Sequence, residues 1–200
     1  MARTSGAKCR LCRREGMKLY LKGTKCEGEK CTLNKRPHAP GQQGSRRKNI
    51  SNYGKQLREK QKAKRIYGIL ERQFRNYVLN SLKTKGVTGE VLLHNLETRF
   101  DNVVYRSGFA VSRGQARQLI RYGVFLVNDK KVDIPSQQLK VGDIIKPVSF
   151  DKIQLREGFV LPEWLQANVK EKYVKFLRLP TQDDVQEKVD IPSIVEYYSR

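Results

Sequence analysis

One stretch decides the fold of this chain: Ser112-Arg113-Gly114-Gln115-Ala116-Arg117-Gln118-Leu119-Ile120-Arg121-Tyr122-Gly123. Ser112 can cap the N-terminus of a helix, and Gln115, three residues on, can return the capping hydrogen bond. Gly123 can end the helix because glycine readily adopts the left-handed conformation. The stretch therefore predicts a short helix of about ten residues, with a start signal and a stop signal.

The faces of this predicted helix differ in character. Ala116 and Ile120 fall on an apolar face that can pack, because residues of a helix are about 100° apart. Arg113, Arg117 and Arg121 fall on another face and predict an outward ridge of guanidinium groups. Like charges at this spacing destabilise an isolated helix, so the ridge needs an anion such as a phosphate backbone. A solvated helix face is the alternative.

The flanking segments complete a small module, residues 98–145. Upstream, the apolar residues of 96–104 have helical spacing and predict a second helix. Downstream, residues 124–132 read as two extended runs joined at Asn128-Asp129, a pair that tolerates positive φ. Residues 139–145 predict a turn and a further strand. The module should therefore be two helices on a small antiparallel sheet.

The net charge favours a polyanionic partner. Lys and Arg total 41 against 20 Asp and Glu, which gives a formal net charge of +21 and a pI of about 10.0. This excess points to nucleic acid or to an anionic membrane surface. Residues 1–65 hold 20 basic and 4 acidic side chains, whereas residues 181–200 hold 2 and 5. We expect the N-terminal third to contact the polyanion and the C-terminal end to face protein.

The sequence has no apolar run long enough to span a membrane. The N-terminus also lacks the apolar core of a secretion signal. We therefore expect a soluble, intracellular protein that neither enters nor crosses a membrane.

All four cysteines lie near the N-terminus, as Cys9-x2-Cys12 and Cys26-x4-Cys31 separated by thirteen residues. Disulfides are disfavoured inside cells, and two close pairs around such a loop are typical of a tetrahedral four-thiolate site. We predict one structural zinc ion, because zinc accepts four thiolates and stabilises folds too small to form a core. An iron–sulfur cluster uses the same ligands, and four unrelated thiols are the alternative.

Two basic segments follow the cysteines. Residues 36–48 are rich in Pro, Gly and Arg, end in Arg46, Arg47 and Lys48, and predict an extended arm that its partner shapes. A flexible linker is the other interpretation of this segment. Residues 55–65 have a helical pattern with six basic groups and one acid, which predicts a second phosphate-binding surface.

The remaining segments are less specific. Residues 71–82 carry apolar groups at helical spacing, and the glycines that follow them mark a domain boundary. Residues 146–167 suggest loops with some packed aromatic surface, and residues 173–179 alternate like a strand. The chain ends in an apolar patch at 194–200 that is too short to be a domain.

These elements resemble one family. The central stretch, with Val127-Asn128, residues 132–136 and Val141-Gly142-Asp143, resembles the RNA-binding module named after small-subunit ribosomal protein S-four. Further matches to bacterial members of the S-four ribosomal protein family cover residues 40–44, 57–62, 65–68, 71–76, 101–106 and 196–200. The four-cysteine N-terminus resembles the metal-binding form of that family.

The resemblance implies an α+β protein of two domains. Residues 1–44 would form the metal knuckle and basic arm, and residues 45–90 a helical domain that residues 181–200 complete. Residues 91–180, with the core module 98–145, would be an inserted RNA-binding domain.

The resemblance also implies a function in the small (30S) ribosomal subunit of the cytoplasm. Family members bind the 5′ domain of 16S ribosomal RNA at a multi-helix junction early in assembly. They contact ribosomal protein S-five and other 30S proteins, influence translational accuracy and help to line the messenger RNA entrance. This implies neither a membrane nor a small-molecule substrate.

The candidate RNA-binding residues are all basic. By resemblance, Arg46, Arg47 and Lys48 would lie at the messenger RNA entrance, and the others would hold ribosomal RNA. These others are Arg113, Arg117, Arg121, Lys55, Arg58, Lys62, Arg65, Arg10, Arg13, Arg14, Lys130 and Lys131.

Two other functions remain open from the sequence. Similar RNA-binding modules accompany pseudouridine synthases and tyrosyl-tRNA synthetases, and Arg99-Phe100-Asp101 echoes the sequence around a synthase's catalytic aspartate. We expect no enzyme, because the chain has no Gly-x4-Gly-Lys sequence and its histidines, His38 and His94, form no nucleophile pattern. A regulator that binds its own messenger RNA is the other alternative.

Overall fold

The computed structural model describes residues 6–46, 49–149, 153, 156, 158–168, 172–185, 187 and 189–199. The chain divides into two compact units. The first unit is Met1–Gly89 with Glu187–Arg200, and the second unit is Glu90–Gln186.

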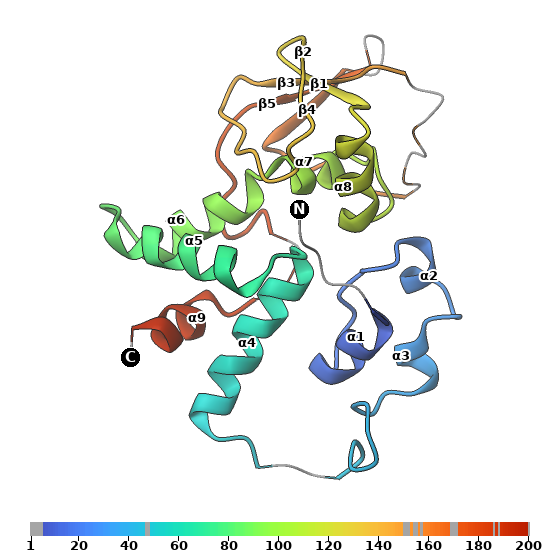
Figure 1. Ribbon diagram of the computed structural model, residues 1–200, viewed down its shortest axis with the longest axis vertical. Coiled ribbons are helices and arrows are strands. Elements are labelled where there is room, and N and C mark those ends of the chain that lie inside the picture. The colour runs from blue at the N-terminus through green and yellow to red at the C-terminus, as the bar shows by residue number, and fades with distance from the viewer. Residues whose placement is uncertain are drawn as a thin grey trace. The chain divides into compact units, whose positions relative to one another are not determined.

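The second unit combines helices with an antiparallel sheet (Figure 1). Its helices are α6 (Thr88–Glu97), which begins at the boundary of the units, α7 (Phe100–Arg106) and α8 (Arg113–Arg121). Its strands are β1 (Phe125–Val127), β2 (Lys130–Lys131), β3 (Ile144–Pro147), β4 (Leu165–Asn168) and β5 (Tyr173–Phe176). They pair in the order β2-β1-β3-β5-β4. The predicted α+β class with an antiparallel sheet is confirmed.

Helix α8 begins and ends where the sequence predicts. The backbone N–H of Gln115 donates to Ser112 Oγ at 3.2 Å. The Gln115 side-chain oxygen in turn accepts from the backbone N–H of Val111 at 2.8 Å, so the return bond goes to the residue before the cap. Gly123 has φ +66° and donates to the carbonyl of Ile120. Local capping chemistry thus fixes this helix.

The apolar face of α8 packs into the core of the second unit. Ala116 and Ile120 are fully buried in one cluster with residues of α7 and the sheet. Phe100 meets Phe125 edge-on with ring centroids 6.2 Å apart, so α7 and β1 share an aromatic contact. Each fully buried aromatic or aliphatic side chain stabilises the fold by about 1.5–3 kcal/mol. The predicted apolar face is confirmed.

The hairpin between β1 and β2 turns at Asn128-Asp129. Both residues have positive φ, 49° and 63°, as a two-residue hairpin loop requires. Asn128 Nδ2 donates to Asp143 Oδ1 at 2.8 Å, and the backbone N–H of Ile144 donates to Asn128 Oδ1 at 2.9 Å. The turn that the sequence predicts is confirmed, and its side chains also connect it to the start of β3.

The helix expected over residues 96–104 is two helices. Arg99 lies between α6 and α7 with extended backbone, φ −62° and ψ 137°. It forms an isolated antiparallel bridge with Gln138, and the backbone N–H of Leu139 donates to the carbonyl of Thr98 at 2.9 Å. This pairing with a distant loop interrupts the helix, and the prediction of one continuous helix is therefore wrong.

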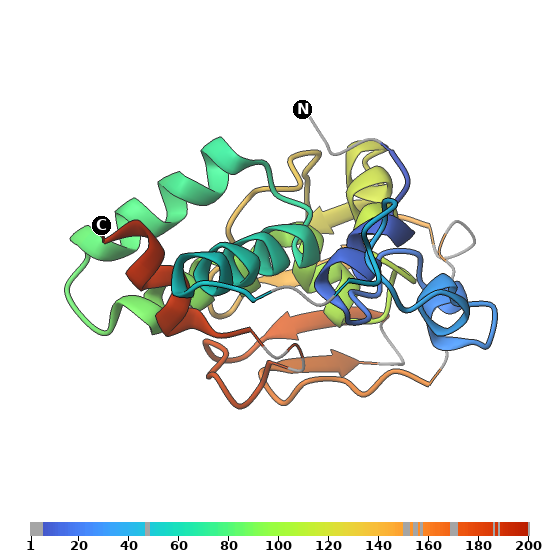
Figure 2. The same ribbon diagram turned by 90° about the horizontal axis from the view of Figure 1, so that it is seen from below.

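The described helices of the first unit are α1 (Cys9–Glu15), α2 (Thr24–Glu27), α3 (Thr32–Lys35), α4 (Asn52–Ile66), α5 (Glu71–Lys83) and α9 (Ile191–Tyr198). Both views show α9 alongside α4 (Figure 1; Figure 2). Phe74 and Val78 of α5 and Ile194 of α9 are buried, and the centroid of the Phe74 ring lies 6.4 Å from that of Tyr198 of α9. The terminal apolar patch of the sequence is therefore one face of a helix that returns to the first unit.

Two further elements differ from the sequence expectation. Strand β4 lies in a segment for which only loops with packed aromatic surface were expected, although Trp164 beside it is indeed fully buried. Strand β5 is confirmed but ends at Phe176, earlier than expected. None of the helices in the described part of the chain has the length and apolar character needed to cross a membrane.

Candidate nucleic-acid interface

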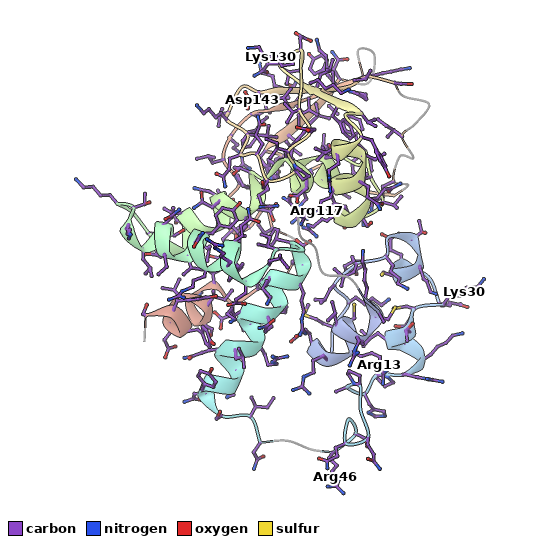
Figure 3. The ribbon with its side chains drawn as sticks, in the orientation of Figure 1. Arg13, Lys30, Arg46, Arg117, Lys130 and Asp143 are labelled. Atoms are coloured by element: carbon purple, nitrogen blue, oxygen red, sulfur yellow. The ribbon has the colours of Figure 1, made fainter. Side chains whose placement is uncertain are left out.

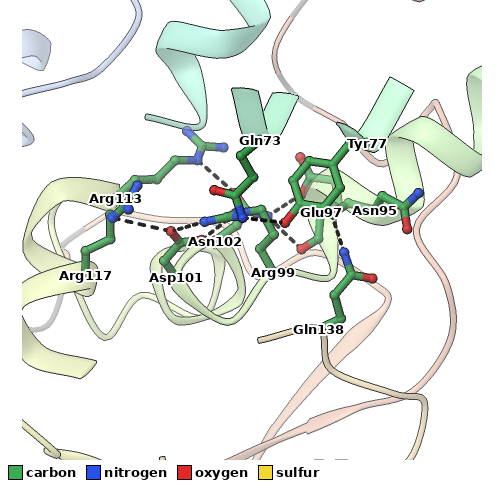
Figure 4. Close-up of polar contacts among 10 residues, drawn as sticks. All are labelled: Gln73, Tyr77, Asn95, Glu97, Arg99, Asp101, Asn102, Arg113, Arg117 and Gln138. Carbon is green, nitrogen blue, oxygen red and sulfur yellow. Dashed lines mark hydrogen bonds and ion pairs between the residues drawn. The ribbon is translucent and has the colours of Figure 1, made fainter. Parts of the chain in front are cut away.

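A network of charged and amide side chains is buried inside the second unit (Figure 4). Glu97 at the end of α6 accepts hydrogen bonds from Arg106 Nε at 3.2 Å and from Arg106 Nη2 at 3.0 Å. Asn102 Nδ2 donates to the same carboxylate at 2.7 Å. Because buried charges need partners that replace water, this cluster holds α6 and α7 in one arrangement.

A second buried pair lies beside the first. Arg99 donates from Nε to Asp101 Oδ1 at 3.0 Å and from Nη2 to Asp101 Oδ2 at 2.8 Å. Both side chains are almost inaccessible to water, and the two parallel hydrogen bonds fix the guanidinium plane. Arg117 of α8 approaches the same carboxylate, with Nε 3.7 Å from Asp101 Oδ2. Helix α8 is thus connected to α7 by charge as well as by apolar packing.

The predicted outward ridge on α8 needs a correction at Arg113. This side chain is 6% exposed. Its Nε donates to Asn102 Oδ1 at 2.8 Å, and its guanidinium lies 4.5 Å from the centroid of the Tyr105 ring. Helical periodicity placed the three arginines on one face correctly, but α7 covers the first turn of that face. Arg117 is partly buried, and Arg121 is exposed.

Arginines of α7, α8 and the residue before α7 share two carboxylates in the described part of the chain. The arginines are Arg99, Arg106, Arg113 and Arg117, and the two carboxylates that connect them are Glu97 and Asp101. Arg156 adds a fifth guanidinium, whose Nη1 donates to the Tyr105 hydroxyl at 3.0 Å. Most of these guanidinium groups are buried, so the exposed Arg121 is the arginine of α8 best placed to meet an anionic ligand.

The hairpin at the edge of the sheet presents further cations. Lys130 and Lys131 form β2 and are both exposed, and Figure 3 shows Lys130 at the hairpin. The acidic residue of the turn, Asp129, is paired with Lys146, whose Nζ lies 3.1 Å from Asp129 Oδ1. The hairpin therefore keeps a net positive charge with which to meet phosphates.

The basic residues of α4 are mostly paired inside the first unit. Arg58 Nη1 lies 3.2 Å from Glu15 Oε1, and Arg65 pairs with the same carboxylate. Lys62 pairs with Glu59 at 2.6 Å, while Lys55 is exposed. The sequence predicted a free phosphate-binding surface on this helix, whereas the structure uses much of its charge to hold α1 against α4.

Burial decides the ionisation of this cluster. The Glu15 side chain is 2% exposed, and burial raises its pKa, although the charges of Arg58 and Arg65 oppose the rise. Burial also lowers the pKa of Arg65, and Glu15 opposes that fall. Both shifts show that burial makes the charged forms of Glu15 and Arg65 less favourable, and the attraction between the two charges offsets only part of this cost.

A third ion cluster joins α4, α5 and α9. Lys60 is 5% exposed and its Nζ lies 2.7 Å from Glu71 Oε1 and 4.6 Å from the centroid of the Tyr197 ring. Glu71 also accepts from Lys64 Nζ at 2.9 Å and from the Tyr198 hydroxyl at 2.9 Å. Partial burial raises the pKa of Glu71, but these three hydrogen bonds outweigh it and lower the pKa to about 2. Lys60 and Lys64 are therefore structural cations.

Replacing Glu71 with glutamine should remove an acid-sensitive part of the stability. The folded pKa of about 2 lies below the value of an unfolded glutamate, so the carboxylate contributes stability at neutral pH that is lost as the pH falls toward 2. The difference in unfolding free energy between wild type and Glu71→Gln should accordingly shrink between about pH 5 and about pH 2.5. Urea titrations followed by circular dichroism would measure this, and a constant difference would contradict the assignment.

The basic residues near the N-terminus lie on α1 and in the arm. Arg10 and Arg14 are exposed on α1, whereas Arg13 Nε donates to the carbonyl of His38 at 2.9 Å and so fixes the start of the arm. Arg46 is exposed (Figure 3). Arg47 and Lys48 lie outside the described residues.

The four cysteines form no disulfide in the structure, and Cys12 lies close enough to the other three to interact with them electrostatically. Cys12, Cys26 and Cys31 are buried, and Cys9 is partly buried. Burial raises the pKa of Cys12, and the charges of the other three cysteines raise it further. The backbone N–H of Lys22 donates to Cys26 Sγ at 3.3 Å, which is the kind of bond that supports a thiolate. Among the described residues, however, no group of three possible ligands has the geometry of a metal site.

The sequence reasoning missed the side chains that hold the arginines of α7 and α8. Glu97, Asn102 and Tyr105 have no role in the predicted module, yet each contacts a buried guanidinium. The available signal is that charges of both signs lie close together at Glu97, Arg99, Asp101 and Arg106, so they can pair with one another when the segment is buried.

The comparisons with known proteins agree with this arrangement. The family model described as "Ribosomal protein S4/S9 N-terminal domain" matches residues 3–97, and the one described as "S4 domain" matches residues 98–145. The chain is 53% identical over 208 residues to small ribosomal subunit protein uS4 of Thermodesulfovibrio yellowstonii. It is 52% identical to the uS4 proteins of Dictyoglomus thermophilum, over 206 residues, and Acetivibrio thermocellus, over 208 residues. Each alignment covers 100% of both chains. These matches confirm the resemblance, and the chain belongs to the family of small ribosomal subunit protein uS4.

Proposed function

We propose that this protein is a structural constituent of the small ribosomal subunit of the cytoplasm and binds its 16S ribosomal RNA. The observation that carries this proposal is the full-length similarity to proteins named for that subunit. The exposed cations Arg121, Lys130 and Lys131 of the second unit support it, because ribosomal RNA presents a dense array of phosphates. A binding role needs no catalytic group, and we propose no reaction for this chain.

The residues suit recognition of a folded RNA by shape. The deep, narrow major groove of an A-form helix hides the base edges, so a protein that binds an RNA junction relies on phosphates and 2′-hydroxyls. Arginine can hold two phosphate oxygens with its planar fork, and Arg117 and Arg121 supply that group on one helix. Lys130 and Lys131 supply point charges on the hairpin. Contacts with several RNA helices at once would neutralise their mutual repulsion and favour early assembly.

The finer assignments are proposals of the same kind. The RNA target would be the multi-helix junction of the 5′ domain, held by the second unit as an inserted RNA-binding domain. Arg46, Arg47 and Lys48 would lie at the messenger RNA entrance, and Arg10, Arg14 and Lys55 would add phosphate contacts. Residues 181–200, with 5 acidic and 2 basic side chains, would face ribosomal protein S-five or another 30S protein.

Fractionation of cells tests the proposal directly. An epitope-tagged full chain should sediment with small ribosomal subunits at moderate salt, and 16S ribosomal RNA should be enriched after its purification. A chain that stays at the top of the gradient, or that copurifies with other RNA only, would contradict the proposal. Release of tritium from uridine-labelled RNA by the pure protein would instead support a pseudouridine synthase.

We further propose that the four cysteines hold one zinc ion. The donor set fits: four thiols lie within two short segments, three of them buried, and a backbone N–H points at one sulfur. Burial raises the pKa values of Cys12 and Cys26, and a bound zinc ion would stabilise the thiolates instead. The ion would supply the folding energy that a segment with little apolar core lacks.

Loss of the metal should follow from replacing Cys12 and Cys26 with serine. Elemental analysis of the purified wild-type protein should find about one zinc ion per chain, and the double variant should bind none. Circular dichroism should show lost helix, because α1 and the segment after it depend on the ion. Lys25→Ala, an exposed change beside Cys26, is the matched control. A metal-free wild type would contradict the proposal, and a visible absorbance band with bound iron would identify an iron–sulfur cluster.

A further inference from the structure

Tyr122, directly after α8, exposes a large aromatic ring to solvent. Its relative exposure is 77%, whereas Tyr53 at 50% already packs on Tyr197 with ring centroids 5.5 Å apart. Within the described residues, the Tyr122 ring meets no other ring and its hydroxyl makes no hydrogen bond. Aromatic rings left in water in this way are typical of contact sites for other molecules.

One basic residue precedes Tyr122 in the chain, and another approaches the residue that follows it. Arg121 precedes Tyr122 and is exposed. On the other side, the Lys131 side chain crosses Gly123 at very close range: a Cβ built on Gly123 would lie 2.1 Å from Lys131 Cε and 2.9 Å from Nζ. Only a glycine leaves room for this approach. The fold therefore places an ammonium group beside the residue that follows Tyr122.

The exposed ring together with the nearby cations favours an RNA strand over an apolar protein surface as the ligand. An apolar protein surface that covered Tyr122 would also have to remove water from Arg121 and Lys131, which is unfavourable without paired anions. A strand of RNA satisfies both groups, because an unpaired base offers a flat π face and its phosphates offer negative charge. Any base can stack, so the contact would read the presence of an unstacked nucleotide and not its identity.

We propose that Tyr122 stacks on an unpaired base of the bound RNA, while Arg121 and Lys131 hold the phosphates beside that base. This inference rests on the proposed function and adds a second kind of contact to it. The arginines and lysines recognise the backbone of a folded RNA, and Tyr122 recognises a nucleotide that has left the helical stack.

A variant series separates stacking from charge. Binding of the full chain to a transcript of the 16S 5′ domain would be measured over a range of salt concentrations. Tyr122→Ala and Tyr122→Leu should each weaken binding about tenfold with an unchanged slope of log K against log salt, because no charge is lost. Tyr122→Phe should bind like wild type. Lys131→Gln should instead make this slope shallower, by the amount that roughly one phosphate contact contributes.

Chemical probing identifies the base. Dimethyl sulfate should modify one adenine or cytosine less in the wild-type complex than in the Tyr122→Ala complex. Wild-type affinity of Tyr122→Ala, or full affinity of Tyr122→Leu, would overturn the stacking inference while leaving the proposed function standing. A Tyr122→Ala chain that binds RNA normally but loses a 30S protein in reconstitution would assign the ring to a protein partner. If the wild-type chain does not bind the transcript, the proposed function itself is overturned.

Discussion

Replacing Glu97 with alanine is expected to destabilise the second unit by about 3–5 kcal/mol, which is the range for breaking a buried ion pair. Glu97 is fully buried and accepts hydrogen bonds from two nitrogens of Arg106 and from Asn102. Its removal takes away the carboxylate that accepts hydrogen bonds from Nε and Nη2 of the buried Arg106. The loss should spread to α8, because Asn102 also accepts the hydrogen bond that holds Arg113.

The single tryptophan makes this measurement specific to the second unit. Trp164 is fully buried in the core of that unit, so its fluorescence during urea unfolding reports on that unit. The control is Glu163→Gln, because the Glu163 side chain is 89% exposed and its pair with Arg178 should contribute little. Equal urea midpoints for Glu97→Ala and the control would show that the network does not hold the unit together.

Reversing the two hairpin lysines is expected to weaken RNA binding by at least about a hundredfold at physiological salt, because two phosphate contacts become repulsive. The slope of log K against log salt should become shallower by the amount that roughly two phosphate contacts contribute. Lys130 and Lys131 are exposed and form only the short edge strand β2, so Lys130→Glu with Lys131→Glu should leave the fold intact. Filter binding to the 16S 5′ domain would measure both quantities.

Two controls make the result interpretable. The neutral pair Lys130→Gln and Lys131→Gln should lose part of the affinity, and the Trp164 unfolding midpoint should be the same in all these proteins. Reversal of Arg113 is a poor test, because that side chain is buried against Asn102 and Tyr105 and its change would unfold the site. Unchanged affinity of the double glutamate variant would exclude the hairpin from the interface.

The elements that the sequence predicts well are those fixed by neighbouring residues. Ser112 and Gly123 bound α8 through capping bonds that span at most five residues, and Asn128-Asp129 turns the hairpin through its own backbone preference. Such signals can be found from the sequence because the atoms involved are close along the chain. The apolar face of α8 follows from periodicity for the same reason.

The elements that the sequence misses depend on distant partners. Arg99 interrupts a helical pattern because it pairs with Gln138. Arg113 looked like an exposed cation because Asn102, its partner, lies on another helix. Glu15 pairs with Arg58 and Arg65, which lie 43 and 50 residues further along the chain, and no local pattern can indicate such pairs. Composition thus predicts the total positive charge, but tertiary contacts decide how much of that charge can bind an anionic partner.

The cysteine pattern is one that the sequence predicts only in part. Spacing along the chain predicts that Cys9, Cys12, Cys26 and Cys31 lie together, and the structure brings the four thiols near one another. It does not give them the geometry of a metal site. Spacing can thus predict which side chains are candidate ligands, whereas the zinc ion stays a proposal that elemental analysis tests.

The salt dependence of binding to the 16S 5′ domain tests the central claim most directly. The full chain should bind this RNA tightly, with log K falling linearly as log salt rises and with a slope that corresponds to several phosphate contacts. It should also bind an unrelated folded RNA of equal length more weakly at every salt concentration. Equal affinity for both RNAs, or no binding in dilute buffer, would contradict the account.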